Sequence, residues 1–318
     1  MDNVFGLYQA FFAQTPWATV IIALVFGLLI GSFLNVVAYR LPIMLAHAWQ
    51  QDAAYIQAVL NAGYSLIQPR PLEFELSLPA PAPPPLTLNK PRSRCPKCET
   101  QIKAWQNIPL LSFLILRGRC ANKTCDAKIP KRYFLVELGT GLASALVIHH
   151  FGATALGGCA LLLTWTLIAL TLIDLDTQLL PDQLTLPLLW LGLLLNFFGI
   201  LVSLEQAVLG AIAGYMSLWL IFHIFKLLTK KEGMGFGDFK LFAAIGAWLG
   251  ISALPATLMI ASLSGSIIGL SMILLKRHKR QVPIAFGPYL ALGGWLMLVF
   301  AEQINQWLPF VPAFGVFE

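Results

Sequence analysis

The sequence predicts an all-α polytopic membrane protein with about eight transmembrane helices and a cytoplasmic domain between helices one and two. Of the 318 residues, 58% are hydrophobic and 11% are charged, whereas soluble domains carry about 25% charged residues. One helical span needs roughly 20 predominantly apolar residues. The apolar stretches that fit lie at 17–39, 134–151, 155–173, 183–203, 207–225, 241–254, 256–275 and 287–308.

The positions of the basic residues predict which side of the membrane each loop faces. All 21 Lys and Arg fall in three blocks, at 40–132, 226–240 and 276–280. The 93 residues 133–225 contain none and fit four spans, and the 35 residues 241–275 contain none and fit two. Because an even number of spans returns the chain to the same side, the positive-inside rule places all three blocks in the cytoplasm and both termini outside. The net charge of +6 then reflects topology, and we expect no nucleic-acid partner.

Three parts of the chain follow from this topology. Residues 1–40 hold the first transmembrane helix, which lacks a preceding basic segment and is expected to be a retained anchor. Residues 41–132 form the cytoplasmic domain, and residues 133–318 form a seven-helix membrane domain. Within the cytoplasmic part, residues 44–67 are typical of an amphipathic helix on the membrane surface. The stretch LPAPAPPPL at 78–86 predicts an extended spacer.

Four of the five cysteines lie in two short pairs within the cytoplasmic domain. Two residues separate the first pair, 21 residues separate the pairs, and four residues separate the second pair; the four are Cys95, Cys98, Cys120 and Cys125. Such pairs match a four-thiolate zinc site, and the reducing cytosol disfavours disulfides. With four protein ligands the Zn²⁺ would be structural, and the alternative is a set of free thiols without metal. Cys159, inside a span, is expected to be a small buried apolar residue.

Carboxylates at the cytoplasmic ends of the spans are the candidates for chemistry, because acids at membrane depth are costly. Asp174 ends span three, Asp182 opens span four, and Asp238 opens span six in the stretch GFGD. Two aspartates from different helices that come close share a proton and titrate as a pair. Such a pair can activate water with one carboxylate and protonate the carbonyl or the leaving amine with the other, as in aspartic proteases.

Simpler interpretations of these acids stay open. Asp182 and Asp238 could be ordinary helix-start residues that the helix dipole favours. Asp174 fits that explanation poorly because it lies at a helix C-terminus, and Asp176 would point elsewhere on the helix. Gly235 and Gly237 would let a peptide backbone approach. The chain has no HExxH or GxSxG motif, and its histidines (47, 149, 150, 223 and 278) show no ligand spacing.

Several long motifs together resemble the type 4 prepilin peptidases of the type IV pilus and type II secretion pathways. They are GSFLNVVAYRLP (31–42), the cysteine segment followed by IPKRYFLVELGTG, LIDLDTQLLPDQLTLPLLWLGL and GMGFGDFKLFAAIGAWLG. The GFGD stretch is similar to the GxGD signature of intramembrane aspartyl proteases. The resemblance covers nearly the whole chain, in the order of the family's motifs. One departure is CANKTC, which stands where the family has CxxC.

The resemblance implies a bifunctional enzyme of the bacterial cytoplasmic (inner) membrane whose active site faces the cytoplasm. It would cut the basic leader of prepilins and pseudopilins after glycine and then N-methylate the new N-terminal residue, usually phenylalanine, with S-adenosyl-L-methionine. The catalytic pair would be Asp174 and Asp238, and Asp182 would be structural. Gly118 and Arg119 match family residues associated with methyl transfer. Glu137 could accept the amine proton or contact the methyl donor, or could simply complement a helix dipole.

Two other functions compete with this one. A peptidase whose zinc domain only recognises substrate would not transfer methyl groups. A proton-coupled membrane transporter could use Asp174, Asp182 and Asp238 as a relay, but carriers place such acids near the midplane and often show inverted repeats. In this sequence the acids gather at one face and no such repeat is seen.

Overall fold

The computed structural model describes residues 15–61, 86–103, 106, 108–122, 124–231, 233–275 and 285–307. Within these ranges the regular secondary structure is helical, and the cysteine segment consists mostly of turns with one short helix and two isolated antiparallel bridges. Most of the expected spacer at 78–86, the basic block at 276–280 and both chain ends lie outside the described residues.

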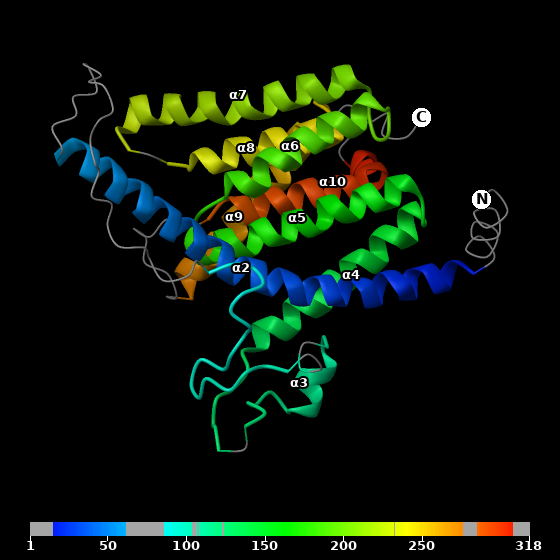
Figure 1. The fold of residues 1–318 in the computed structure, drawn as a ribbon. Helices are drawn as coiled ribbons and strands as arrows, with labels where there is room; N and C mark the ends of the chain where they lie inside the picture. Colours follow the sequence, from blue (N-terminus) through cyan, green and yellow to red (C-terminus); the bar gives the residue numbers. More distant parts are fainter. Residues whose placement is uncertain are drawn as a thin grey trace.

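The first described helix, α2, is much longer than the span expected there. It runs from Pro16 to Asn61 and contains 46 residues, which is roughly 69 Å of helix against a hydrocarbon core of about 30 Å. The helix expected at 44–67 is present in its described part, but residues 44–61 continue α2 and do not form a separate surface helix. Pro42 lies inside the helix without ending it, and the Ala, Gln and Leu residues that follow are strong helix formers. Figure 1 shows α2 passing beyond the other helices on one side of the molecule.

Eight long helices coincide with the eight apolar stretches of the sequence. After α2 come α3 (Leu111–Ile115), α4 (Lys131–Phe151), α5 (Ala155–Thr177), α6 (Asp182–Phe197), α7 (Leu204–Thr229), α8 (Phe236–Leu249), α9 (Ala253–Leu274) and α10 (Gly287–Trp307). The short α3 is the one helix among the described residues that lies in the cysteine segment.

Five of these helices are long and apolar enough to cross a membrane: α2, α4, α5, α7 and α9. The chain is thus a multi-pass membrane protein. Helices α6 and α8 have only 16 and 14 residues, which corresponds to roughly 24 and 21 Å. Helix α8 is enclosed by protein, because every residue from Leu241 to Leu249 is buried.

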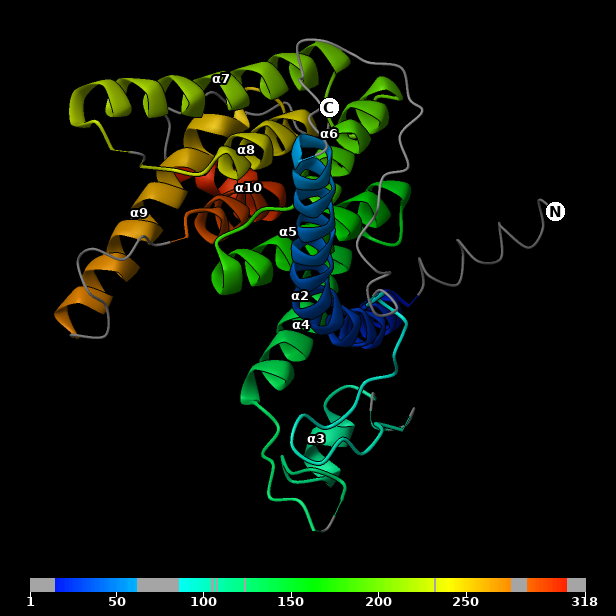
Figure 2. The same cartoon turned by 60° about the vertical axis from the view of Figure 1, so that its left-hand side comes forward.

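Helix α8 forms the centre of the membrane bundle, with α6, α7 and α10 packed around it (Figures 1 and 2). The contact with α7 depends on glycine. A Cβ atom on Gly210 would lie 2.2 Å from the carbonyl oxygen of Gly246, and a Cβ on Gly246 would lie 2.2 Å from that of Gly210. Small residues allow this close approach, which substitutes for the missing hydrophobic force between helices in lipid.

The cysteine segment lies beside the middle of α2 and the start of α4 and is tied to both (Figure 1). The buried guanidinium of Arg40 in α2 donates hydrogen bonds of 2.7 Å to each of the Thr87 and Pro91 carbonyl oxygens. The backbone N–H of Leu110 donates a 2.9 Å hydrogen bond to Glu137 in α4. Because these bonds join residues far apart in sequence, the segment is held against the membrane helices.

Candidate functional site

Asp174 lies three residues before the end of α5, and its side chain is directed into the bundle. The residue is 4% exposed, and its Oδ2 atom has no hydrogen-bond partner among the described residues. The backbone N–H of Gly287, the first residue of α10, acts as donor to this carboxyl group. A carboxylate so deeply buried normally pairs both of its oxygens, because burial of an unpaired polar atom costs about 1–3 kcal/mol.

Asp238 lies in the first turn of α8 and is 7% exposed. Its carboxyl group interacts electrostatically with that of Asp174, and the backbone of Gly235 supplies a hydrogen bond. The structure thus brings together two buried acids that are 64 residues apart in the sequence and belong to different helices.

Two helix N-termini converge on these carboxyl groups. Asp238 belongs to the N-terminus of α8, and Asp174 meets the N-terminus of α10 at Gly287. The positive end of a helix dipole stabilises a nearby anion. Because Asp174 lies at the C-terminus of α5, the dipole of its own helix disfavours a negative charge there, as the sequence indicates. The positive N-terminal end of α10 offsets this effect.

Leu180, in the connection between α5 and α6, packs over the glycines beside the acids. A Cβ atom on Gly237 would lie 2.7 Å from the Leu180 Cβ, so Gly237 makes room for Leu180. The expectation that Gly237 leaves space for a peptide backbone is therefore wrong in this structure. The space beside Gly235 is more open, because a Cβ atom there would lie no closer than 3.8 Å to another group, the Asp238 Oδ2.

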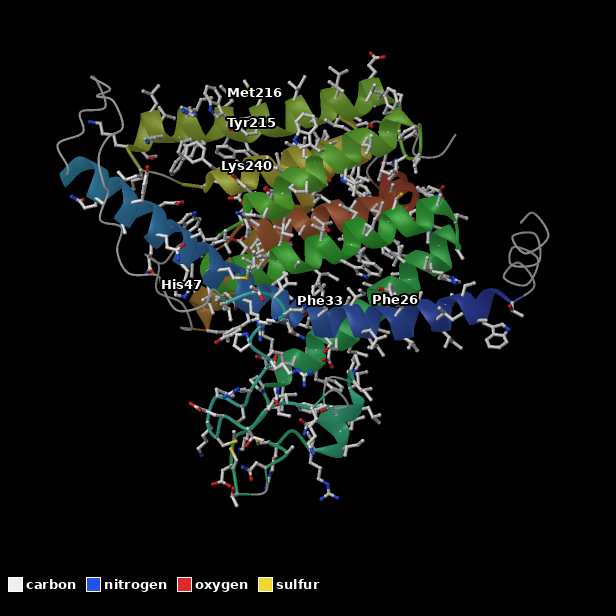
Figure 3. All side chains as sticks on the ribbon, in the orientation of Figure 1. Phe26, Phe33, His47, Tyr215, Met216 and Lys240 are labelled. Atoms are coloured by element: carbon white, nitrogen blue, oxygen red, sulfur yellow. The ribbon has the colours of Figure 1, made fainter. Side chains whose placement is uncertain are left out.

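The other two acids of this region form ion pairs and lie outside the buried pair. Asp182, at the start of α6, accepts hydrogen bonds of 2.6 and 2.8 Å from Lys240 Nζ of α8. Figure 3 shows Lys240 near the start of α8. Asp176 pairs with Arg132 of α4. Both ion pairs join neighbouring helices and are partly exposed.

The four cysteines converge on one point in the segment between α2 and α4. Their Sγ atoms all lie within 4.8 Å of one another, with Cys95 to Cys125 at 3.9 Å and Cys98 to Cys120 at 3.7 Å. A tetrahedral Zn²⁺ with four Zn–S bonds of about 2.3 Å sets its sulfur atoms roughly 3.8 Å apart. The donor set and its spacing therefore fit a zinc ion.

The wider second cysteine pair closes through its own turn. Cys125 N–H donates to the Asn122 carbonyl and Cys120 N–H donates to that of Ala127, each at 2.9 Å. The four intervening residues in CANKTC therefore do not prevent the convergence of the thiols. Hydrogen bonds from the Thr100 side chain and backbone lower the pKa of the Cys98 thiol to about 6, whereas burial and the neighbouring thiols raise the pKa of Cys120 to about 11 and also raise that of Cys125. Four thiols this close oppose one another's ionisation, and a bound cation would favour the thiolate form that a metal site requires.

Gly118 and Arg119 lead into this second pair. Gly118 has a φ of +67°, and a Cβ there would lie 3.1 Å from the ring of Phe113, so this turn requires glycine. Arg119 forms an antiparallel bridge with Lys128. Both cations line an open pocket of about 410 Å³ beside the cysteines, together with Asp126.

Glu137 lies at the junction between the domain and the membrane. Its carboxyl group is half-buried and accepts hydrogen bonds from the Leu110 N–H and the Ser32 side chain. These partners belong to the cysteine domain and to α2. The pocket of Arg119 does not include Glu137.

Sequence reasoning did not single out Gly287 or Leu180. One signal was present, because Gly287 and Pro288 precede an apolar run, and proline in the first turn is typical of a helix start. Nothing local shows that this start meets Asp174, since the contact spans more than a hundred residues.

Comparison with known proteins finds matches to two family models. Residues 25–151 match the bacterial peptidase A24 N-terminal domain, and residues 161–270 match the type IV leader peptidase family. The chain is 50% identical over 295 residues to the "Prepilin leader peptidase/N-methyltransferase" of Stutzerimonas stutzeri, covering 93% of this chain and 95% of the relative.

Proteins of the same name from two further organisms are also similar. That of Pseudomonas aeruginosa is 48% identical over 93% of this chain and 95% of its own length, and that of Neisseria gonorrhoeae is 48% identical over 92% and 96%. No solved structure matches the chain. The length and identity of these matches show that the chain belongs to the type IV leader peptidase family.

Proposed function

We propose that this protein cleaves the leader peptide of prepilins and pseudopilins after glycine and then N-methylates the new N-terminal residue, usually phenylalanine. The observation that carries the peptidase assignment is the buried pair of Asp174 and Asp238 on two helices of the membrane bundle. Relatives that are about half identical over nearly the whole chain carry the name of both activities.

The pair supplies acid and base in one site. Two carboxyl groups that repel each other at short range cannot easily both ionise, so one keeps a proton. The ionised carboxylate takes a proton from water as the water oxygen attacks the scissile carbonyl carbon. The protonated partner then gives its proton to the leaving amine as the C–N bond breaks.

The position of the site suits a substrate with an apolar stem and a basic leader. Asp174, Asp238 and Gly287 lie at helix ends on the same side of the bundle as the attachment of the cysteine segment. By the positive-inside argument this side faces the cytoplasm. We therefore place the protein in the bacterial inner membrane with eight spans, where water and the leader reach the acids from the cytoplasm.

We assign Cys95, Cys98, Cys120 and Cys125 as ligands of one structural Zn²⁺. The support is the mutual distance of at most 4.8 Å between the four Sγ atoms. A four-thiolate site leaves no open coordination position, so the ion would hold the fold of the domain.

We assign the S-adenosyl-L-methionine site to the pocket beside the cysteines. Arg119 and Lys128 would bind the carboxylate of the methyl donor, and Asp126 would accept hydrogen bonds from its ribose hydroxyls. When bound, the donor supplies the sulfonium methyl group for transfer to the amine that cleavage exposes. Gly118 shapes the turn before Arg119.

Glu137 receives a different role from the one expected by resemblance. Its hydrogen bonds to Leu110 and Ser32 join the cysteine domain to α2 and α4. We therefore propose that Glu137 fixes the position of the domain, with no direct contact to the methyl donor.

One assay tests both activities. The purified protein is incubated with a prepilin and labelled S-adenosyl-L-methionine, and the product is weighed. We expect loss of the leader and gain of one methyl group. Cleavage without methylation would leave a peptidase whose zinc domain recognises substrate, and full cleavage by Asp174→Asn or Asp238→Asn would disprove the catalytic pair. Both variants should insert normally, because each change keeps the size of the side chain.

The structure does not favour the transporter alternative, which needs Asp174, Asp182 and Asp238 to act together as a proton relay. Asp182, its middle member, is paired with Lys240, and the remaining two acids are the buried pair at one end of the bundle.

A further inference from the structure

The N-terminus of α10 meets the buried acid Asp174 without any side chain between them. Gly287 is the first residue of α10. A Cβ atom there would lie 2.6 Å from Asp174 Oδ2 and 3.1 Å from Leu180 Cδ1. Real Cβ atoms do not approach an oxygen so closely, so every residue other than glycine would displace the carboxyl group or Leu180.

Gly287 also has the one backbone N–H in the first turn of α10 that is available to this acid. Pro288 has no N–H, and the amides of Tyr289 and Leu290 both donate to the Phe286 carbonyl, at 3.1 and 3.2 Å. The Gly287 N–H is directed to the Asp174 carboxyl group. Within the described part of α10, no other amide of the first turn reaches Asp174.

The second oxygen of the acid shows why this contact matters. Asp174 is 4% exposed, and its Oδ2 is buried without a hydrogen-bond partner among the described residues. An orphaned buried oxygen is costly in a purely structural carboxylate. In a working acid it is the atom that remains free for water, substrate or the partner acid.

We propose that Gly287 is a positioning residue of the peptidase, whose backbone N–H orients the Asp174 carboxyl group and whose missing side chain keeps Oδ2 free for the reaction with Asp238 and water. This inference rests on the proposed peptidase function. It adds a third helix end to the two that carry the acids.

The test replaces Gly287 with Ala and measures kcat and KM for leader cleavage. We expect kcat to fall about 100-fold, the loss typical of a misplacement of about 1 Å in a catalytic group. KM should change little, because the substitution displaces the acid and removes no group that we assign to substrate binding. The matched control is Gly293→Ala in the same helix, where the new Cβ would lie 2.5 Å from the Thr257 carbonyl oxygen. It carries a similar steric load away from the acids, so its thermal stability should fall while kcat is retained.

A second variant separates the acid from its packing. Leu180→Ala removes the methyl groups that lie 3.1 and 3.2 Å from the new Cβ but leaves the 2.6 Å contact with Oδ2. The double variant Leu180→Ala, Gly287→Ala should therefore fold and stay defective in kcat. Recovery of the kcat of Leu180→Ala in the double variant would refute the inference, since Gly287 would then serve only packing. This comparison decides the matter even if Gly287→Ala alone does not fold.

The outcome for Gly287 is distinct from the outcome for the proposed function. If the unmodified protein does not cleave a prepilin, the proposed function fails. If it cleaves, Asp174→Asn abolishes cleavage and Gly287→Ala keeps full kcat, the positioning role alone is overturned.

Discussion

Replacement of Asp182 by Asn removes the negative charge from the ion pair that joins α6 to α8. Lys240 Nζ lies 2.6 Å from Oδ1 and 2.8 Å from Oδ2, and the two side chains are 29% and 51% exposed for Lys240 and Asp182. Because half of the Asp182 side chain remains in water, we expect the pair to contribute about 0.2–1 kcal/mol to stability. The melting temperature should then fall by no more than about 2–4 °C.

The effect on catalysis should be equally small. Even if the whole lost free energy of about 1 kcal/mol raised the activation barrier, by shifting Asp238 on the same helix as Lys240, the cleavage rate would fall only about fivefold. Initial rates of leader cleavage on a purified prepilin measure this, with Asp174→Asn as the inactive reference. The control Asp176→Asn breaks the exposed pair with Arg132 and should behave like Asp182→Asn. A loss of cleavage in Asp182→Asn at unchanged melting temperature would refute the structural role of Asp182 and assign it to the chemistry.

Three further changes test other parts of the structure. Cys95→Ser should remove zinc and should reduce methylation more than cleavage, whereas the control Cys159→Ser should retain both. If metal analysis found stoichiometric zinc in Cys95→Ser, the zinc site would be contradicted. Gly246→Ala should cost about 1–3 kcal/mol, because the new Cβ would lie 2.2 Å from the Gly210 carbonyl oxygen; an unchanged unfolding midpoint would argue against the tight contact. Arg40→Met removes the hydrogen bonds to the Thr87 and Pro91 carbonyls, so limited proteolysis should cut the cysteine domain faster; equal digestion would show that the domain is held by other contacts.

Long apolar runs predicted the positions of the helices well, and five of these helices are long and apolar enough to cross a membrane. All eight apolar stretches coincide with helices, because in lipid a helix must satisfy its own backbone hydrogen bonds and this requirement is local. The end of α2 was predicted poorly. Residues 44–61 carry no signal that stops a helix, and the pattern alone does not tell a surface helix from a continuation of the span.

The cysteine cluster was predicted as a set, since the ligand count and the short spacings are local features. The pairing of Asp174 with Asp238 was a hypothesis that rested on their similar predicted depth in the membrane and on the resemblance to the prepilin peptidases. Their coulombic contact became visible only in the folded bundle. The same holds for the partners of Asp182 and Glu137, whose hydrogen bonds join residues 58 and 27 positions apart.

The sequence by itself determined the membrane class, the positions of the helices and the four thiols, because composition and spacing encode these features locally. It pointed to the two acids through their positions at helix ends and through the family resemblance. The tertiary structure alone decided which helix ends meet. It placed the N-terminus of α10 against Asp174 and filled the space above Gly237 with Leu180. It also placed the carboxyl group of Glu137 where it accepts a hydrogen bond from Leu110 of the cysteine domain. Such contacts depend on how whole helices pack against one another, and no short stretch of sequence carries that information.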